Sequence, residues 1–192
     1  MTFPELDKKF DNIVRDLATE RGQMMVDLGV TALKMIKERV QETGVDAKGS
    51  KYRPYSTKAM LVGCKSMNAS VCNSFFGKEN NKKHEWRTVN GKHLAILPGG
   101  YKKLREMHNR RTDITNFSWS NDMWNDINIR SNQGQHEQGT VIIGAKLDKE
   151  KKKLAHHTKD RGDILDLNPT EIAELYKKCE LTSLQIIRNN GL

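Results

Sequence analysis

Cysteine and histidine side chains in the middle of the chain are the first residues to consider as metal ligands. Cys64 and Cys72 are separated by seven residues, and His84 and His93 by eight. Structural zinc sites usually pair their cysteine ligands two to four residues apart, so that both reach one ion from a single turn. The spacing here departs from that pattern, and the sequence therefore predicts no metal site in this region.

A pair of histidines and three aspartates lie nearer the C-terminus. His156 and His157 are adjacent, so on a helix their side chains point about 100° apart and cannot hold one ion together. Asp160, Asp163 and Asp166 recur every third residue, and a metal-dependent nuclease would need such carboxylates to converge on one or two ions. Turn and capping roles before a following helix explain the three aspartates more simply.

The sequence also lacks the motifs of catalytic nucleophiles and of nucleotide binding. It contains no G-x-S-x-G and no Walker A motif, and Gly99-Gly100 alone indicates a turn. We therefore expect no catalytic residue, no metal, no cofactor and no enzymatic activity. A nuclease or another hydrolase is the least favoured hypothesis for this chain, because no group of residues supplies the geometry that a catalytic site needs.

Basic residues interleaved with aromatic ones offer a different chemistry, which is contact with phosphate. They occur in residues 82–87, KKHEWR, in residues 101–105, YKKLR, and shortly afterwards at positions 110 and 111. No motif for reading base edges accompanies them, so any binding of nucleic acid should be non-specific and strongly weakened by salt. The candidate residues for contact with nucleic acid or an acidic partner are Lys82, Lys83, Arg87, Lys102, Lys103, Arg110 and Arg111.

The distribution of charge is more informative than the net charge of +9. Residues 49–112 have 14 basic and 3 acidic side chains, a net charge of +11. Residues 1–48 have 8 basic and 9 acidic side chains, and residues 113–192 have 11 and 12. Such a local field attracts phosphate or an acidic protein surface, although a solvated loop kept soluble by lysine would have the same composition.

Composition favours one domain that completes its burial against other subunits. The chain has 192 residues, of which 36% are hydrophobic and 6% aromatic, low values for a compact enzyme of this length. Three cysteines at unrelated spacings indicate free thiols in a reducing compartment. We find no apolar run of membrane-spanning length and no signal-peptide core, so we expect a soluble protein made in the cytoplasm, with no membrane contact.

A long amphipathic helix is predicted at the N-terminus. Thr2 and Glu5 match a capping box, apolar residues then recur in steps of three and four, and Thr43-Gly44 is a plausible end. The pattern falters around Gly22, so the segment is either one helix of some forty residues or two helices with a hinge. A helix this long is not stable alone in so small a domain, and its apolar stripe needs the rest of the fold or another subunit.

The middle of the chain has weaker signals. Residues 44–55 are predicted to form a loop, and Ser56-Thr57 to cap a short helix that ends near Leu61. Residues 63–98 have no clear period and are interpreted as an irregular basic insertion, with a hairpin near Trp86–Ile96. Loops of this length inside a compact domain are often functional or ordered by a partner.

The remaining chain is expected to alternate short helices and strands. Asn168-Pro169-Thr170-Glu171 is typical of a helix start, and the last helix should run to about Arg188. This last helix is expected to bury Ile172, Leu175, Tyr176, Cys179, Leu184 and Ile187. The other expected elements are a helix over 101–109, a strand near 114–119, a helical turn over 120–127, strands over 127–130 and 140–145, a basic helix over 149–157 and an extended run over 163–167.

Together these elements predict an α+β fold in a single domain, residues 1–192, with residues 63–98 as an insertion. A long N-terminal amphipathic helix, a small antiparallel sheet and a C-terminal helix packed on that sheet would form its body.

Four stretches, in this order, resemble the virion morphogenesis proteins of tailed bacteriophages, a family of tail-completion and head–tail junction components. The first is the end of the long helix with the loop after it, VQETGVDAKGSKYRPYSTKAM, in which Tyr52 stands where the family usually has tryptophan. The second is GGYKKLREMHNRRTDITNFSWSNDMWNDI, in which Asn121 replaces a glycine of the family's Thr-Gly-Asp-Met element and also tolerates positive φ. The third and fourth are TVIIGAK and KLAHHTKDRGDILDLNPTEIAELYKK. The match covers about two thirds of the chain and excludes residues 63–98.

This resemblance implies a structural virion protein without catalytic residues or cofactor. The implied assembly is a homo-oligomeric ring, with sixfold or related symmetry, at the neck or the top of the tail. Its partners would be neighbouring neck, portal-adaptor or tail-tube proteins, with non-specific contact to passing DNA, and it would be made in the cytoplasm of a bacterial host. The alternative hypothesis is a free-standing basic protein that binds nucleic acid non-specifically.

Overall fold

The chain folds into two compact units. The structure, a computed structural model, describes residues 2–64, 67, 69–76, 85–118, 121–130, 139–162 and 164–191. Unit 1 comprises Met1–Lys51 and Asn116–Leu192, and unit 2 comprises Tyr52–Thr115. The sequence suggested a single domain with residues 63–98 as an insertion. Unit 2 is larger than that insertion, because Tyr52, Tyr55 and Leu104 are buried in it.

Unit 1 begins with the predicted long helix, α1, which spans Phe3–Glu38 and continues as a π-helical turn, η1, over Arg39–Thr43. The backbone N–H of Thr2 donates to the Glu5 carboxylate over 2.7 Å, as expected for the predicted capping box. The helix passes through Gly22 without a break, so the version with a hinge is wrong. Gly44, at φ +67°, ends the helix where it was predicted to end.

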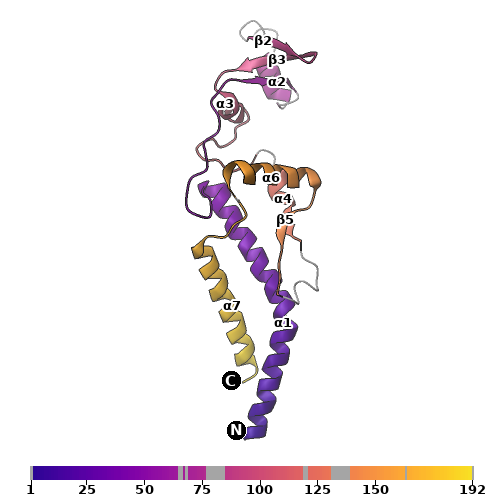
Figure 1. Cartoon of the computed structure of the whole chain (residues 1–192), viewed down its shortest axis with the longest axis vertical. Helices are drawn as coiled ribbons and strands as arrows, with labels where there is room; N and C mark the ends of the chain where they lie inside the picture. Colours follow the sequence, from indigo (N-terminus) through magenta and orange to yellow (C-terminus); the bar gives the residue numbers. More distant parts are fainter. Residues whose placement is uncertain are drawn as a thin grey trace. The chain divides into compact units, whose positions relative to one another are not determined.

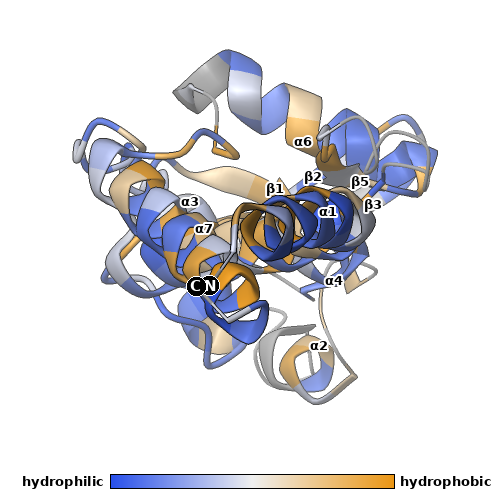
Figure 2. Ribbon diagram, turned by 90° about the horizontal axis from the view of Figure 1, so that it is seen from below, coloured by the Kyte–Doolittle hydropathy of each residue, from blue (hydrophilic) through white to orange (hydrophobic). Residues whose placement is uncertain are grey.

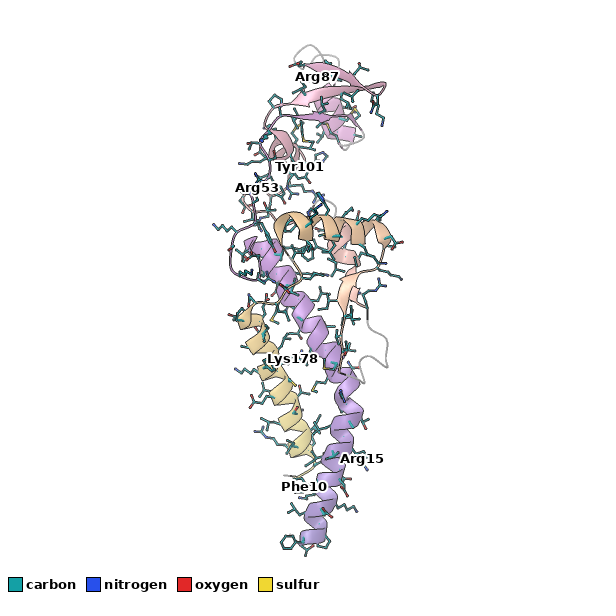
Figure 3. All side chains as sticks on the ribbon, in the orientation of Figure 1. Phe10, Arg15, Arg53, Arg87, Tyr101 and Lys178 are labelled. Carbon is teal, nitrogen blue, oxygen red and sulfur yellow. A yellow bond between two sulfur atoms is a disulfide. The ribbon has the colours of Figure 1, made fainter. Side chains whose placement is uncertain are left out.

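The C-terminal helix, α7, spans Pro169–Asn189 and lies antiparallel to α1 (Figure 1). The Lys178 ammonium reaches from α7 to the Thr31 hydroxyl over 2.5 Å (Figure 3), and the Asn190 amide donates to Asp16 over 3.1 Å. The expectation that this helix packs on the sheet is corrected, because α7 packs along α1. One reason is that α1 itself occupies a face of the small sheet of unit 1, at Gly29.

That sheet has two antiparallel strands, β4 (Ile127–Ile129) and β5 (Ile143–Ala145). Both strands were predicted, although each is shorter than expected. A Cβ atom at Gly29 would lie 2.6 Å from Val141 and 3.2 Å from Ile129. Glycine at this position therefore lets α1 approach the hairpin closely.

Unit 1 also contains the helices α4 (Asp122–Asp126) and α6 (Asp148–Arg161). Both were predicted, and Asn121 before α4 has positive φ (+65°), a conformation that asparagine tolerates. The Asp126 carboxylate accepts the backbone N–H groups of Lys146 and Leu147 over 2.6 and 2.7 Å, just before α6. These bonds satisfy amides that have no partner within the helix.

The predicted strand near 114–119 is wrong. Residues 114–118 form no strand, and residues 119 and 120 lie outside the described part of the chain. Phe117 has φ +52°, a conformation that interrupts a ladder of extended residues. The Trp124 indole instead donates to the Asn116 carbonyl over 3.1 Å, which holds this segment against α4.

Buried polar contacts join the end of α1 to the start of α7. Arg39 and Glu171 form a salt bridge of 2.8 Å, with side chains 7% and 8% exposed. Arg39 also donates to the carbonyls of Val45 and Asp166. The second oxygen of Glu171 accepts the backbone N–H of Asn168 over 2.7 Å, which completes the predicted cap of α7.

Unit 2 is built on a three-stranded antiparallel sheet of order β1-β3-β2. The sheet residues Val62, Ala95 and Leu97 are buried together with Leu104 of α3. The elements of unit 2 are β1 (Met60–Val62), α2 (Ala69–Phe76), β2 (Trp86–Val89), β3 (Lys92–Leu97) and α3 (Gly100–Met107).

The hairpin predicted near residues 86–96 is confirmed, with Trp86 opposite Ala95 and Val89 opposite Lys92. The short helix predicted to end near Leu61 is wrong, because Met60–Val62 pair with β3 instead. Residues 63–98 are also more regular than expected, since they contain the helix α2 besides the expected hairpin. The helix predicted over 101–109 is confirmed as α3.

Two of the three cysteines are not free thiols, in contrast to the expectation. Cys64 and Cys72 form a disulfide that links the segment after β1 to α2, whereas Cys179 is free. In the folded chain the Cα atoms of the two cysteines lie 5.2 Å apart, which is a normal distance for a disulfide. The spacing that does not suit zinc therefore suits a disulfide.

Candidate partner-binding surfaces

The described candidate basic residues all belong to unit 2, on three of its segments. Arg87 lies on β2 (Figure 3) and is exposed, as is Arg110 after α3. Lys102 and Lys103 occupy adjacent positions of α3, so their side chains point about 100° apart. Lys82 and Lys83 lie outside the described residues. In a ring of the kind that the resemblance implies, Lys82, Lys83, Arg110 and Arg111 are predicted to project towards a partner, and this stays a prediction.

Three of these cations have a carboxylate partner within a few residues. Arg87 lies 3.4 Å from Glu85, and Lys103 lies 3.5 Å from Glu106. Arg111 lies 2.9 Å from Asp113 and is 44% exposed. Exposed pairs of this kind contribute only about 0–1 kcal/mol each, so a polyanion could replace the carboxylates at little cost.

Arg105 is a cation that cannot contact a partner. It is 1% exposed, lies 4.3 Å from the centre of the Tyr55 ring and donates to the Arg111 carbonyl over 2.9 Å. The sequence grouped it with the basic and aromatic residues that could grip phosphate, and that grouping is corrected. Its role is to hold the segment after α3 against the core of unit 2.

The aromatic residues beside the basic ones also belong to the fold. Tyr101 packs edge-to-face on Tyr55, with ring centres 5.5 Å apart, and is half-buried. Trp86 is half-buried on β2. Stacking on bases requires an accessible aromatic face, so these residues favour a contact with the backbone of a polyanion rather than with bases.

The charge of the molecule divides at the boundary between the units. Residues 52–115 have 13 basic and 4 acidic side chains, a formal charge of +9, which equals that of the whole chain. Residues 1–51 and 116–192 have 20 of each. Unit 1 is therefore neutral as a whole, and an attraction for polyanions originates in unit 2.

His108 in unit 2 has a pKa below its ordinary value of 6.5. Burial disfavours the charged imidazolium, and the charge of Arg110 acts in the same direction. At neutral pH this histidine adds no positive charge to the basic unit.

The residues considered for metal binding are not assembled into a site within the described chain. Cys64 and Cys72 are used in the disulfide. His157 packs on Phe117, with ring centres 4.7 Å apart, and its ring centre is 5.8 Å from that of His156. The side chains of His84, His93, Asp160 and Asp163 lie outside what the structure describes, and in the described part no three His, Cys, Asp or Glu side chains are grouped to hold an ion.

Unit 1 exposes a second kind of surface, which is apolar. Phe3, Phe10 and Val14 of α1 are 89%, 51% and 67% exposed. Their spacing of seven and four residues places them on one side of the helix, and we name them the N-terminal ridge. The carbonyl of Gly191, just after α7, accepts from Lys9 over 2.7 Å, so the first turns of α1 extend beyond α7 (Figure 1).

The prediction of a fully buried apolar face on α7 is wrong for three residues. Ile172, Tyr176 and Leu184 are exposed, and Leu181 is exposed as well. Figure 2 shows hydrophobic and hydrophilic residues distributed around both helices. A pair of helices can bury only one stripe of each, so the remaining apolar residues are available to another molecule. The apolar pattern of these residues predicted that they are buried, but the sequence does not identify the surface that would cover them.

Comparisons with known proteins add nothing to this picture, because no protein-family model, no curated protein and no solved structure matches the chain. The likeness to phage assembly proteins thus stays a resemblance of ordered motifs. Among the described residues, no helix is both long enough and apolar enough to cross a membrane.

Proposed function

We propose that this chain is a structural protein of a tailed-bacteriophage virion, one subunit of a ring at the head–tail junction. It acts as a tail-completion or neck protein and has no enzymatic activity. Neighbouring neck, portal-adaptor or tail-tube proteins are its partners within the particle. The ring has sixfold or related symmetry.

The observation that carries this proposal is the uncovered apolar surface of unit 1. The N-terminal ridge and Tyr176 of α7 are exposed on a unit with no net charge. Removing such residues from water stabilises an assembly by roughly 25 cal/mol per Å², and a neutral unit meets a second copy without overall repulsion. The order of the four motifs supports the same class of protein.

The partition of charge supports a separate contact for unit 2. Its charge of +9 is not matched by an acidic excess in unit 1. The partner of unit 2 is therefore a polyanion from outside the ring, which in this proposal is passing DNA or an acidic face of a neighbouring ring.

A free-standing protein that binds nucleic acid non-specifically is the second candidate, favoured by the same charge of +9 on unit 2. It requires DNA binding by a monomer or dimer and leaves the exposed apolar residues of unit 1 without a role. A ring protein instead assembles with itself and binds DNA weakly.

Light scattering across protein concentration, with and without duplex DNA, separates the two candidates. A discrete higher oligomer without DNA, ring-shaped in electron micrographs, supports the proposal. A monomer whose mass increases only with DNA contradicts it and favours the nucleic-acid candidate.

A further inference from the structure

Unit 1 contains an open apolar groove between the β5 region and α6. Ile142 and Ile143 of the β5 region and Leu154 of α6 contribute to it, together with Leu165. Its volume is about 740 Å³, and it is widely open to solvent. Ala155 of α6 also lines the groove and is exposed.

We propose that the N-terminal ridge of one copy of this chain docks in this groove of a second copy. The inference rests on the proposed self-assembly and names its interface. It is a head-to-tail contact, since the ridge and the groove are different surfaces of the same unit.

The length of α1 argues that the occupant is a second copy. The helix runs without a break from Phe3 to Glu38 and meets the hairpin at Gly29. At 1.5 Å per residue, Phe3 lies about 39 Å along the helix from that contact. A rigid helix cannot fold the ridge back into the groove of its own chain, so the ridge can fill only the groove of another molecule.

The charges around the two surfaces are complementary. Asp7 lines a shallow depression together with Phe3 and Phe10, and Asp11, one position after Phe10, is exposed. Lys9 is engaged elsewhere, at the Gly191 carbonyl. Asp7 and Asp11 therefore place acidic side chains beside Phe3 and Phe10, whereas Arg15, next to Val14, pairs with Asp16 at 3.4 Å.

The groove has basic side chains along its rim. Arg130, Lys151 and Lys159 line it, and no acidic residue is among its described lining residues. Lys151 pairs with Asp148 of its own helix at 2.8 Å, so Arg130 and Lys159 supply the positive charge that a second copy would meet. Apolar contact at the centre and opposite charges at the rim are the usual arrangement of a specific interface.

Head-to-tail contacts of this kind also explain why the ridge is so exposed in one chain. Each copy offers one ridge and one groove, so every added copy covers both a ridge and a groove. Closure into a ring leaves neither uncovered, whereas an open chain leaves one of each.

A pair of variants tests the interface directly. Phe3→Ser with Phe10→Ser removes the two aromatic residues of the ridge and leaves the groove intact. Ala155→Trp fills the groove and leaves the ridge intact. All three positions are exposed, so both variants are expected to fold, which the circular dichroism and melting temperature of each would verify. Val30→Ser is the matched control, because Val30 is 55% exposed on α1 outside the ridge.

The expected masses in light scattering are specific. The wild type and Val30→Ser form the same higher oligomer, and the ridge and groove variants are each monomeric. An equimolar mixture of those two variants forms a heterodimer and nothing larger, because only one ridge and one groove remain functional.

Three outcomes would overturn the interface. If the ridge variant forms the wild-type oligomer, the ring proposal stands and this interface is wrong. If the mixture stays monomeric, the ridge and the groove do not bind each other. A wild type that is monomeric at every concentration would overturn both the interface and the self-assembly on which it rests.

Discussion

At the scale of single residues, the contact between Arg39 and Glu171 is a buried salt bridge that joins two distant parts of unit 1. Both side chains are buried, and each makes further bonds, Arg39 to two carbonyls and Glu171 to the cap of α7. Removing one partner leaves an uncompensated buried charge.

Arg39→Ala should therefore destabilise the protein by about 3–5 kcal/mol, measured as the change in free energy of unfolding in urea. Arg15→Ala is the control, because Arg15 forms an exposed pair with Asp16 at 3.4 Å. That change should cost less than about 1 kcal/mol. Equal effects of the two substitutions would contradict the account of the buried contact.

His108 provides a pH dependence whose sign follows from its lowered pKa. Above pH 6.5 the histidine is mostly neutral in both states and has little effect. As the pH falls below that value, the unfolded chain binds the proton before the folded chain does, so stability decreases.

The melting temperature of the wild type should consequently decrease more between about pH 7.5 and about pH 5.5 than that of the variant His108→Gln. Thermal unfolding followed by circular dichroism measures both. An identical loss in the two proteins would mean that His108 titrates normally.

Local signals made several residues predictable, whereas contacts between distant residues were not. The capping residues Thr2 and Asn168 and the positive φ of Asn121 depend on neighbours within three or four positions. Arg39 and Glu171 are 132 positions apart, and no periodicity relates them. The burial of Arg105 under Tyr55 was missed for the same reason.

At the scale of elements, two glycines of α1 have opposite roles. Gly22 lies in the helix interior with no positive φ, whereas Gly29 faces the hairpin so closely that a Cβ atom would lie 2.6 Å from Val141.

Gly22→Ala should stabilise the protein by up to about 1 kcal/mol, because alanine is the better helix former. Gly29→Ala should destabilise it by about 1 kcal/mol or more, because the added methyl group forces the hairpin away. Chemical unfolding of the two variants, side by side, measures the difference. Stabilisation by both substitutions would contradict the close packing of α1 on Val141 and Ile129.

The disulfide between Cys64 and Cys72 can be counted chemically. The denatured, unreduced protein should react with one equivalent of a thiol reagent, at Cys179, and with three after reduction. The chain-entropy relation gives such a short loop a stabilisation of about 2–3 kcal/mol. Three reactive thiols without reduction would show that the bond is absent and restore the prediction of free cysteines.

Helices and strands with a clear period were predicted, and their packing partners were not. The apolar positions of α7 predicted its helical structure correctly, but Tyr176 faces outward and the helix lies along α1 instead of the sheet. Residues 60–62 form a strand because β3, more than thirty positions away, pairs with them. Helical propensity cannot anticipate such pairing.

At the scale of the whole molecule, the division of charge assigns a different kind of interaction to each unit. Unit 1 is neutral and exposes the ridge and the groove, whereas unit 2 has the entire net charge of +9. Moderate salt has little effect on the apolar centre of the proposed interface and screens only the charges at its rim, whereas it weakens binding to a polyanion steeply because counterions are released. Self-assembly and DNA binding should therefore respond differently to salt.

Sedimentation velocity across salt concentration, with and without duplex DNA, tests this division most directly. Between about 50 and about 200 mM salt, we expect the discrete oligomer to persist while its association with DNA is lost. If the oligomer dissociates in parallel with the loss of DNA, or never forms without DNA, the account of an apolar assembly through unit 1 is contradicted.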